Sequence, residues 1–107
     1  MDENEFLRLA DSCLSSAAKW LETLDPDEVD YTTGDGVVTI EFPDGARFVL
    51  SRQRAARQMW LAADASGFHY GWDDGSRTWL EEKDHHELFA RLAELLGGKF
   101  GHPVDPA

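Results

Sequence analysis

Cysteine is almost absent from this sequence, and long apolar runs are missing altogether. The single Cys13 excludes an internal disulfide and cannot by itself hold a zinc or iron–sulfur centre, which takes several thiolate or imidazole ligands. No run approaches the roughly 18 apolar residues of a membrane-spanning helix. The acidic start MDENEF also lacks the basic character of a secretory or transit peptide. These absences predict a soluble, cytoplasmic protein without a membrane partner, in which oxygen atoms bind any metal.

The motifs of the common enzyme classes are missing as well. There is no Gly-x-Ser-x-Gly, no His-Glu-x-x-His and no phosphate-binding glycine loop. The adjacent acids Asp73 and Asp74 stand beside Gly75 in a segment typical of a solvent-exposed turn. The sequence therefore predicts that this protein is not an enzyme.

Basic residues are scarce, and their distribution is uneven. The chain has 10 Lys and Arg against 21 Asp and Glu, a net charge of −11. Residues 1–46 carry 12 acids and 2 bases, whereas residues 47–60 carry 4 arginines and no acid. The only basic cluster, RQRAAR at 52–57, is too short for a nucleic-acid interface, which needs many phosphate contacts. Nucleic acid is therefore excluded as a partner.

Helical periodicity is clear in the first part of the chain. Apolar side chains recur at spacings of three and four, which predicts an amphipathic helix over residues 4–24. Pro26 cannot continue the helix, and it disfavours helical geometry in the residue before it. The predicted buried stripe consists of Phe6, Ala10, Cys13, Ala17, Leu21 and Leu24.

A second helix is predicted over residues 85–97. Asp84 is its expected N-cap, and Gly97-Gly98 its expected end, leaving a short tail at 99–107. His85 and His86 would then be exposed residues of the first turn. Their side chains would point about 100° apart, which does not favour binding one metal ion together.

Between the two helices the apolar period changes to two. Short segments rich in β-branched and aromatic residues alternate with Gly, Pro and Asp turns across residues 27–80. With 28–32 as a first edge strand, the expected strands are 37–42, 47–51, 58–62, 68–72 and 78–80. The prediction is an α+β fold: a single domain, 1–107, forming a two-layer sandwich. Its antiparallel sheet has five to six strands, and the N- and C-terminal helices pack on one face.

One sheet face would then remain uncovered. Alternation directs Gln58, Trp60 and His69 toward it. A Trp beside glutamines and arginines is typical of an interface anchor. A partly shielded sheet residue is the alternative, because single exposed apolar residues are common.

The stretch DPDEVD, residues 25–30, has four carboxylates and no base, and Glu22 precedes it. These acids follow a helix end whose partial negative charge repels them. Alternation would place Glu28 and Asp30 on one outward face. A bound cation would relieve the repulsion. A solvated edge that prevents strand-to-strand aggregation is the alternative, and residue types alone favour it.

The stretch SRQRAARQMWLAADASGFHYGW, residues 51–72, with EFLRLAD in the first helix, resembles bacterial frataxins of the CyaY type. The resemblance covers about residues 4–98. It implies a frataxin-like fold and a regulator of iron–sulfur cluster assembly. Such a protein binds Fe2+ or Fe3+ weakly through an acidic ridge, carries no organic cofactor and docks on cysteine desulfurase. The resemblance further implies contact with the cluster scaffold protein, and a monomer that iron can drive to oligomerise.

The resemblance also assigns roles to residues. The implied metal ligands are Glu22, Asp25, Asp27, Glu28, Asp30 and Asp11. The implied partner-binding residues are Trp60, Gln58, Gln53, Ser51, His69 and Arg52. Ala18, Lys19 and Thr32 stand where relatives often carry acids, so the ridge would be thinner here. The alternative function is an acidic protein–protein interaction module that binds metal only incidentally.

Overall fold

The computed structural model describes residues 1–106 and begins with the predicted amphipathic helix. α1 spans Glu3–Glu22, and the Asp2 carboxylate caps it by accepting a 2.8 Å hydrogen bond from the Glu5 N–H. Its predicted apolar stripe is buried up to Leu21, and Leu24 packs beside the core. The helix ends two residues earlier than expected, with Thr23 as its C-cap.

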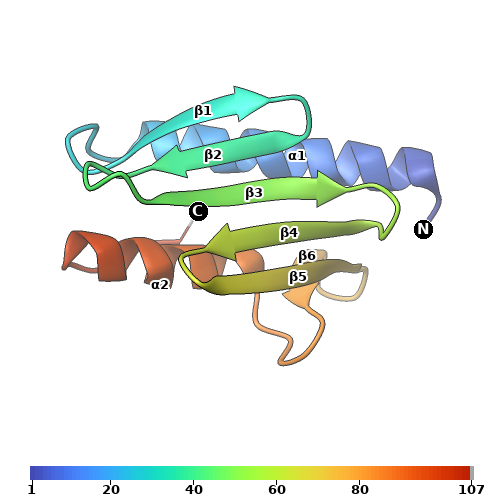
Figure 1. Ribbon diagram of the computed structural model, residues 1–107. Helices are drawn as coiled ribbons and strands as arrows, with labels where there is room; N and C mark the ends of the chain where they lie inside the picture. The colour runs from blue at the N-terminus through green and yellow to red at the C-terminus, as the bar shows by residue number, and fades with distance from the viewer. Residues whose placement is uncertain (107) are drawn as a thin grey trace.

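A six-stranded antiparallel meander follows, with neighbours in chain order, which confirms the predicted fold. In Figure 1 both helices lie behind the sheet, and its front face is open. The strands are β1 Asp30–Gly34, β2 Val37–Glu41, β3 Arg47–Gln53, β4 Gln58–Ala63, β5 Ser66–Asp73 and β6 Thr78–Glu81.

The first strand starts later than predicted. The backbone N–H groups of Glu28 and Val29 both donate to the Asp25 carbonyl, at 3.0 and 3.1 Å, so these residues form a turn. Val29 is buried as expected. Glu28, however, lies outside the strand, and the alternation rule that paired it with Asp30 does not apply to it.

The second helix differs from its prediction at both ends. α2 spans Leu88–Phe100 rather than 85–97, because the Glu87 carboxylate caps it by accepting from Phe89 N–H and Ala90 N–H. The double glycine lies inside the helix, and Gly101, at φ 78°, ends it in the left-handed conformation that glycine favours.

The core lies between the sheet and the two helices. Its largest fully buried side chains include Phe6 from α1, Phe48 from β3, Tyr70 from β5 and Leu92 from α2. Cys13 is also buried, as predicted, and burial raises the pKa of its thiol to about 12. Neither helix in the described residues has the length and apolar character that crossing a bilayer requires.

Candidate functional site

Five acids lie at the end of α1 and just after it, and we call them the acidic edge: Glu22, Asp25, Asp27, Glu28 and Asp30. The Asp25 carboxylate accepts a 2.9 Å hydrogen bond from the Asp27 N–H, which stabilises the turn. The Glu22 carboxylate accepts a 2.7 Å hydrogen bond from the Tyr31 hydroxyl and so ties the helix end to β1. That hydrogen bond is the main cause of the raised pKa of Tyr31.

Glu28 points toward the C-terminal tail. Nε2 of His102 lies 2.9 Å from both of its carboxylate oxygens. This hydrogen bond raises the pKa of His102, which favours the charged imidazolium. The sequence could not reveal the contact, because 74 residues separate the two side chains. One carboxylate of the acidic edge is therefore already hydrogen-bonded to a histidine of the protein itself.

Asp30 begins the edge strand β1, and its carboxylate accepts a 2.8 Å hydrogen bond from the neighbouring Tyr31 N–H. Directly opposite in the register lies Glu41 of β2. The sequence analysis missed Glu41, although pairing the two predicted strands would have brought it beside Asp30. Opposed like charges on adjacent strands repel each other.

Asp11, the sixth predicted metal ligand, lies apart from the acidic edge. It is eleven residues before Glu22 on α1, about 16 Å along the helix axis. Its carboxylate pairs with the Arg52 guanidinium, which also lies 3.0 Å from Asp35. Within residues 1–106, no group of three or more His, Cys, Asp or Glu side chains is placed to hold a metal ion. A cation at the acidic edge would thus bind one or two carboxylates and keep water as its other ligands.

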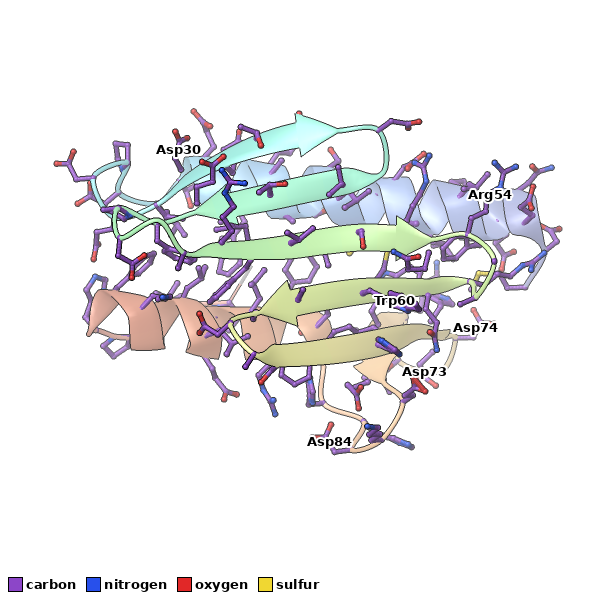
Figure 2. All side chains as sticks on the ribbon, in the orientation of Figure 1. Asp30, Arg54, Trp60, Asp73, Asp74 and Asp84 are labelled. Atoms are coloured by element: carbon purple, nitrogen blue, oxygen red, sulfur yellow. The ribbon has the colours of Figure 1, made fainter. Side chains whose placement is uncertain are left out.

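On the open side of the sheet, five of the predicted partner-binding residues share one surface. We call Ser51, Gln53, Gln58, Trp60 and His69 the Trp60 face. Ser51, Trp60 and His69 are register partners on β3, β4 and β5. Figure 2 shows Trp60 on this open side and Asp30 near the β1 edge of the sheet.

Contacts among the side chains of the Trp60 face hold them in defined orientations. The rings of Trp60 and His69 stack with centroids 4.3 Å apart and planes 12° from parallel. The Trp60 indole N–H donates to Gln58 Oε1 at 2.9 Å, and the Gln53 amide donates to the Ser51 hydroxyl at 3.0 Å. An aromatic side chain with few alternative orientations suits recognition, because little conformational entropy is lost on binding.

Arg52, the sixth predicted partner-binding residue, lies on the other face of the sheet. Its register partner is Met59, which is fully buried, and its guanidinium contacts Asp11 of α1. Strand alternation accounts for this placement, because Ser51 and Gln53 on either side of it face outward. Arg54 of the same cluster pairs with Glu3 at 2.7 Å. Acids of the protein itself thus already engage two arginines of the basic cluster.

A model of the frataxin-like domain matches residues 1–102. The chain belongs to the frataxin-like family.

Individual relatives of this frataxin-like chain agree with that assignment. The iron-sulfur cluster assembly protein CyaY of Dechloromonas aromatica (strain RCB) is 35% identical over 104 residues, covering 97% of each chain. The frataxin of Psychromonas ingrahamii is 27% identical, with a TM-score of 0.87 over 98% of this chain and 97% of its own. Trimeric frataxin from Saccharomyces cerevisiae, complexed with ferrous iron, is 26% identical with a TM-score of 0.76 over 87% and 86%.

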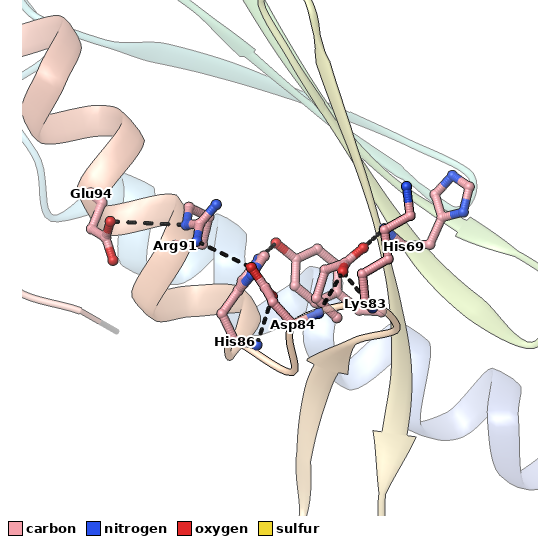
Figure 3. A network of polar contacts seen from close by, with 8 residues as sticks. His69, Lys83, Asp84, His86, Arg91 and Glu94 are labelled. Carbon is pink, nitrogen blue, oxygen red and sulfur yellow. Dashed lines mark hydrogen bonds and ion pairs between the residues drawn. The ribbon is translucent and has the colours of Figure 1, made fainter.

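The loop between β6 and α2 supports the Trp60 face of this frataxin-like protein, and the sequence analysis missed it. Figure 3 shows its polar contacts, which run from His69 to Glu94 on α2. His86 is half-buried there: its ring contacts the Tyr70 hydroxyl at 2.7 Å and the Asp84 carboxylate. The expectation that His86 is an exposed helical residue is therefore wrong, because the helix begins only at Leu88.

Proposed function

We propose that this chain regulates iron–sulfur cluster assembly by docking on cysteine desulfurase through the Trp60 face and binding Fe2+ or Fe3+ weakly at the acidic edge. The observation that carries the proposal is the stacked, hydrogen-bonded Trp60 on the sheet face opposite the two helices. Membership of the frataxin-like family and the CyaY relative support the pathway.

The Trp60 face has the composition expected of a protein-binding surface. Trp is enriched among residues that contribute most to binding energy, especially where polar groups surround it. Here two glutamines, one serine and one histidine surround the indole. We propose the desulfurase as the main partner and the cluster scaffold protein as the second.

The acidic edge supplies oxygen ligands that suit iron as a transient cargo. Exposed carboxylates bind such ions weakly and with poor selectivity, so Ca2+, Mg2+ and Mn2+ should compete. We add Glu41 to the proposed ligands because it lies opposite Asp30. We leave Asp11 out because of its ion pair with Arg52. The ferrous complex of the trimeric yeast relative supports iron binding. We further propose that this chain is a monomer and that iron can drive it to oligomerise.

The two surfaces are far enough apart to work at the same time. Trp60 lies three strands from β1, about 14 Å across the sheet. Across the sheet Trp60 pairs with Ser51, Ser51 with Val37, and Val37 with Gly34 on β1. Gly34 lies about 13 Å along the strand from Asp30. Iron at the acidic edge and the desulfurase on the Trp60 face would then be on the order of 20 Å apart. Binding one would not displace the other.

Replacing Trp60 tests docking directly. Trp60→Ala should weaken binding to the organism's own desulfurase at least about tenfold, measured by calorimetry or pull-down. Thr39→Ala, on the same open side but on β2, is the control and should bind like wild type. Unchanged binding by Trp60→Ala, with its thermal midpoint intact, would rule out this docking surface.

The alternative function is an acidic module that binds a basic partner and takes up metal only incidentally. The His102 contact to Glu28 favours it, as does the finding that residues 1–106 hold no group of three or more side chains placed to bind a metal ion. The amide variant Glu22→Gln/Asp30→Asn separates the two functions. If iron regulates, this variant should lose anaerobic Fe2+ binding and the iron response of desulfurase turnover but keep docking. If the acids only bind a partner, docking at low salt should fall and iron should not affect turnover.

A further inference from the structure

His69, on the Trp60 face, is held by Glu81, the last residue of β6, and by Glu82, the first residue of the loop that follows. Its backbone N–H donates to Glu81 at 3.1 Å, and its carbonyl accepts from the Glu82 N–H at 2.9 Å. The Glu82 carboxylate lies 2.9 Å from ring atom Nδ1 of His69. Backbone and ring are therefore both fixed, with the ring stacked on Trp60.

The contact with Glu82 decides which nitrogen of the ring carries the proton. An ionised carboxylate can only accept a hydrogen bond, so Nδ1 must be the donor. In the neutral imidazole Nε2 is then left as an acceptor. The His69 side chain is 43% exposed, on the open side of the sheet. The Trp60 face therefore presents an indole ring beside one oriented hydrogen-bond acceptor.

We propose that Glu82 is a positioning residue of the Trp60 face and that the partner protein donates a hydrogen bond to Nε2 of His69 while packing a side chain on Trp60. This inference rests on the proposed docking function. A basic partner surface fits best, because arginine guanidinium both donates hydrogen bonds and stacks on aromatic rings, and this chain has a net charge of −11.

The free protein gives the first test, through the tautomer of His69. Long-range 15N–1H correlation spectra should show the Nδ1–H form in wild type. Glu82→Ala should shift the population toward the Nε2–H form, whereas Glu82→Gln, whose amide oxygen can still accept, should keep Nδ1–H. An unchanged tautomer in Glu82→Ala would overturn the positioning role. Glu5→Ala, on α1, removes the same type of side chain away from the Trp60 face and is the matched control.

Binding to cysteine desulfurase gives the second test. Glu82→Ala should weaken the affinity about five- to tenfold, and His69→Phe, which keeps a ring for stacking but lacks Nε2, should weaken it at least as much. The two losses should not add in the double variant, because both remove one interaction. Wild-type affinity in Glu82→Ala, or fully additive losses, would overturn the inference.

The failures of the two proposals can be told apart. If wild type does not bind the desulfurase, or Trp60→Ala binds normally, the proposed docking fails and this inference fails with it. If wild type binds and Trp60→Ala does not, but Glu82→Ala binds normally, only the inference about Glu82 fails.

Discussion

Glu81 is the buried charged residue in the described part of the chain, with 5% of its surface exposed. Its carboxylate accepts backbone hydrogen bonds from Lys83 at 2.7 Å, His69 at 3.1 Å and Asp84 at 3.4 Å. Burial by itself raises the pKa of Glu81, but these backbone donors outweigh it and lower the pKa below the ordinary 4.5. The ionised side chain thus stabilises the loop that supports His69.

Replacing Glu81 should therefore destabilise the protein in a pH-dependent way. We expect Glu81→Gln to lower the free energy of unfolding by about 1–3 kcal/mol at pH 7, because it places an NH2 group among N–H donors. The stabilisation is complete above the unfolded pKa of 4.5 and is lost as the pH falls through the lower folded value. Urea denaturation of both proteins at pH 7 and at about pH 3 would measure it. Equal stability at pH 7 would contradict the expectation.

The contact between His102 and Glu28 leads to a second prediction at the residue scale, about the pKa of His102. The pKa of His102 is raised above 6.5, chiefly by the hydrogen bond with Glu28. Its contribution to stability is complete below pH 6.5 and is lost as the pH rises through the folded value. Glu28→Gln should lower the pKa of His102 in an NMR titration. Asp27→Asn, next to it, is the control and should leave most of the shift in place.

At the scale of the element, the two glycines of α2 have different surroundings. A Cβ atom at Gly97 would lie 3.2 Å from the His102 carbonyl oxygen, whereas one at Gly98 would contact nothing within 4 Å. Gly97 thus lets the C-terminal tail cross closely over the helix. This packing accounts for a glycine at position 97 inside the helix, but not for the one at position 98.

Alanine substitutions at these glycines should accordingly differ. Gly98→Ala should raise the free energy of unfolding by up to about 1 kcal/mol, because alanine favours the helix. Gly97→Ala should gain clearly less, or lose stability, because its methyl group pushes the tail away. Thermal denaturation would measure both effects, and the His102 ring signals would report tail displacement. Equal stabilisation by the two variants would show that the tail does not pack as described.

At the scale of the whole molecule, the ion pairs of the basic cluster and the mutually repelling carboxylates of the acidic edge lie in different places. The arginines at 52 and 54 contact acids of α1, while the acidic edge retains carboxylates that repel one another. The fold keeps these acids close despite their repulsion, because the Tyr31 hydroxyl binds Glu22 and a hydrogen bond to Asp25 stabilises the turn. The fold therefore maintains a negative field at one edge of the sheet.

This field should be measurable as a dependence of stability on salt. The thermal midpoint should rise as NaCl increases from about 0.01 to 0.3 M, since the Debye length then falls well below 10 Å. Asp27→Asn/Asp30→Asn should have a higher midpoint than wild type at low salt and a smaller response to salt. Thermal scans by circular dichroism would measure this. If the midpoint of the variant is unchanged, the acids of this edge are not under strain.

The residue order by itself determined the layers of this protein. Apolar spacings of three and four in Phe6 to Leu21, and alternation in β4 and β5, decide which side chains are buried, because helix and strand periods are fixed by backbone geometry. The same alternation predicted that Trp60 and His69 share the open face. Such inferences rely on neighbours in sequence and need no knowledge of distant contacts.

Tertiary structure alone decided the contacts between residues far apart in sequence. His102 contacts Glu28, 74 residues away in the sequence. Arg52 lies on the sheet face opposite Trp60 and contacts Asp11, 41 residues away. The start of α2 at Leu88 likewise depended on the loop whose groups bind Tyr70 and His69. Hydrogen bonds and ion pairs are short-ranged, so they form only after folding has brought their groups together, and no local pattern records them.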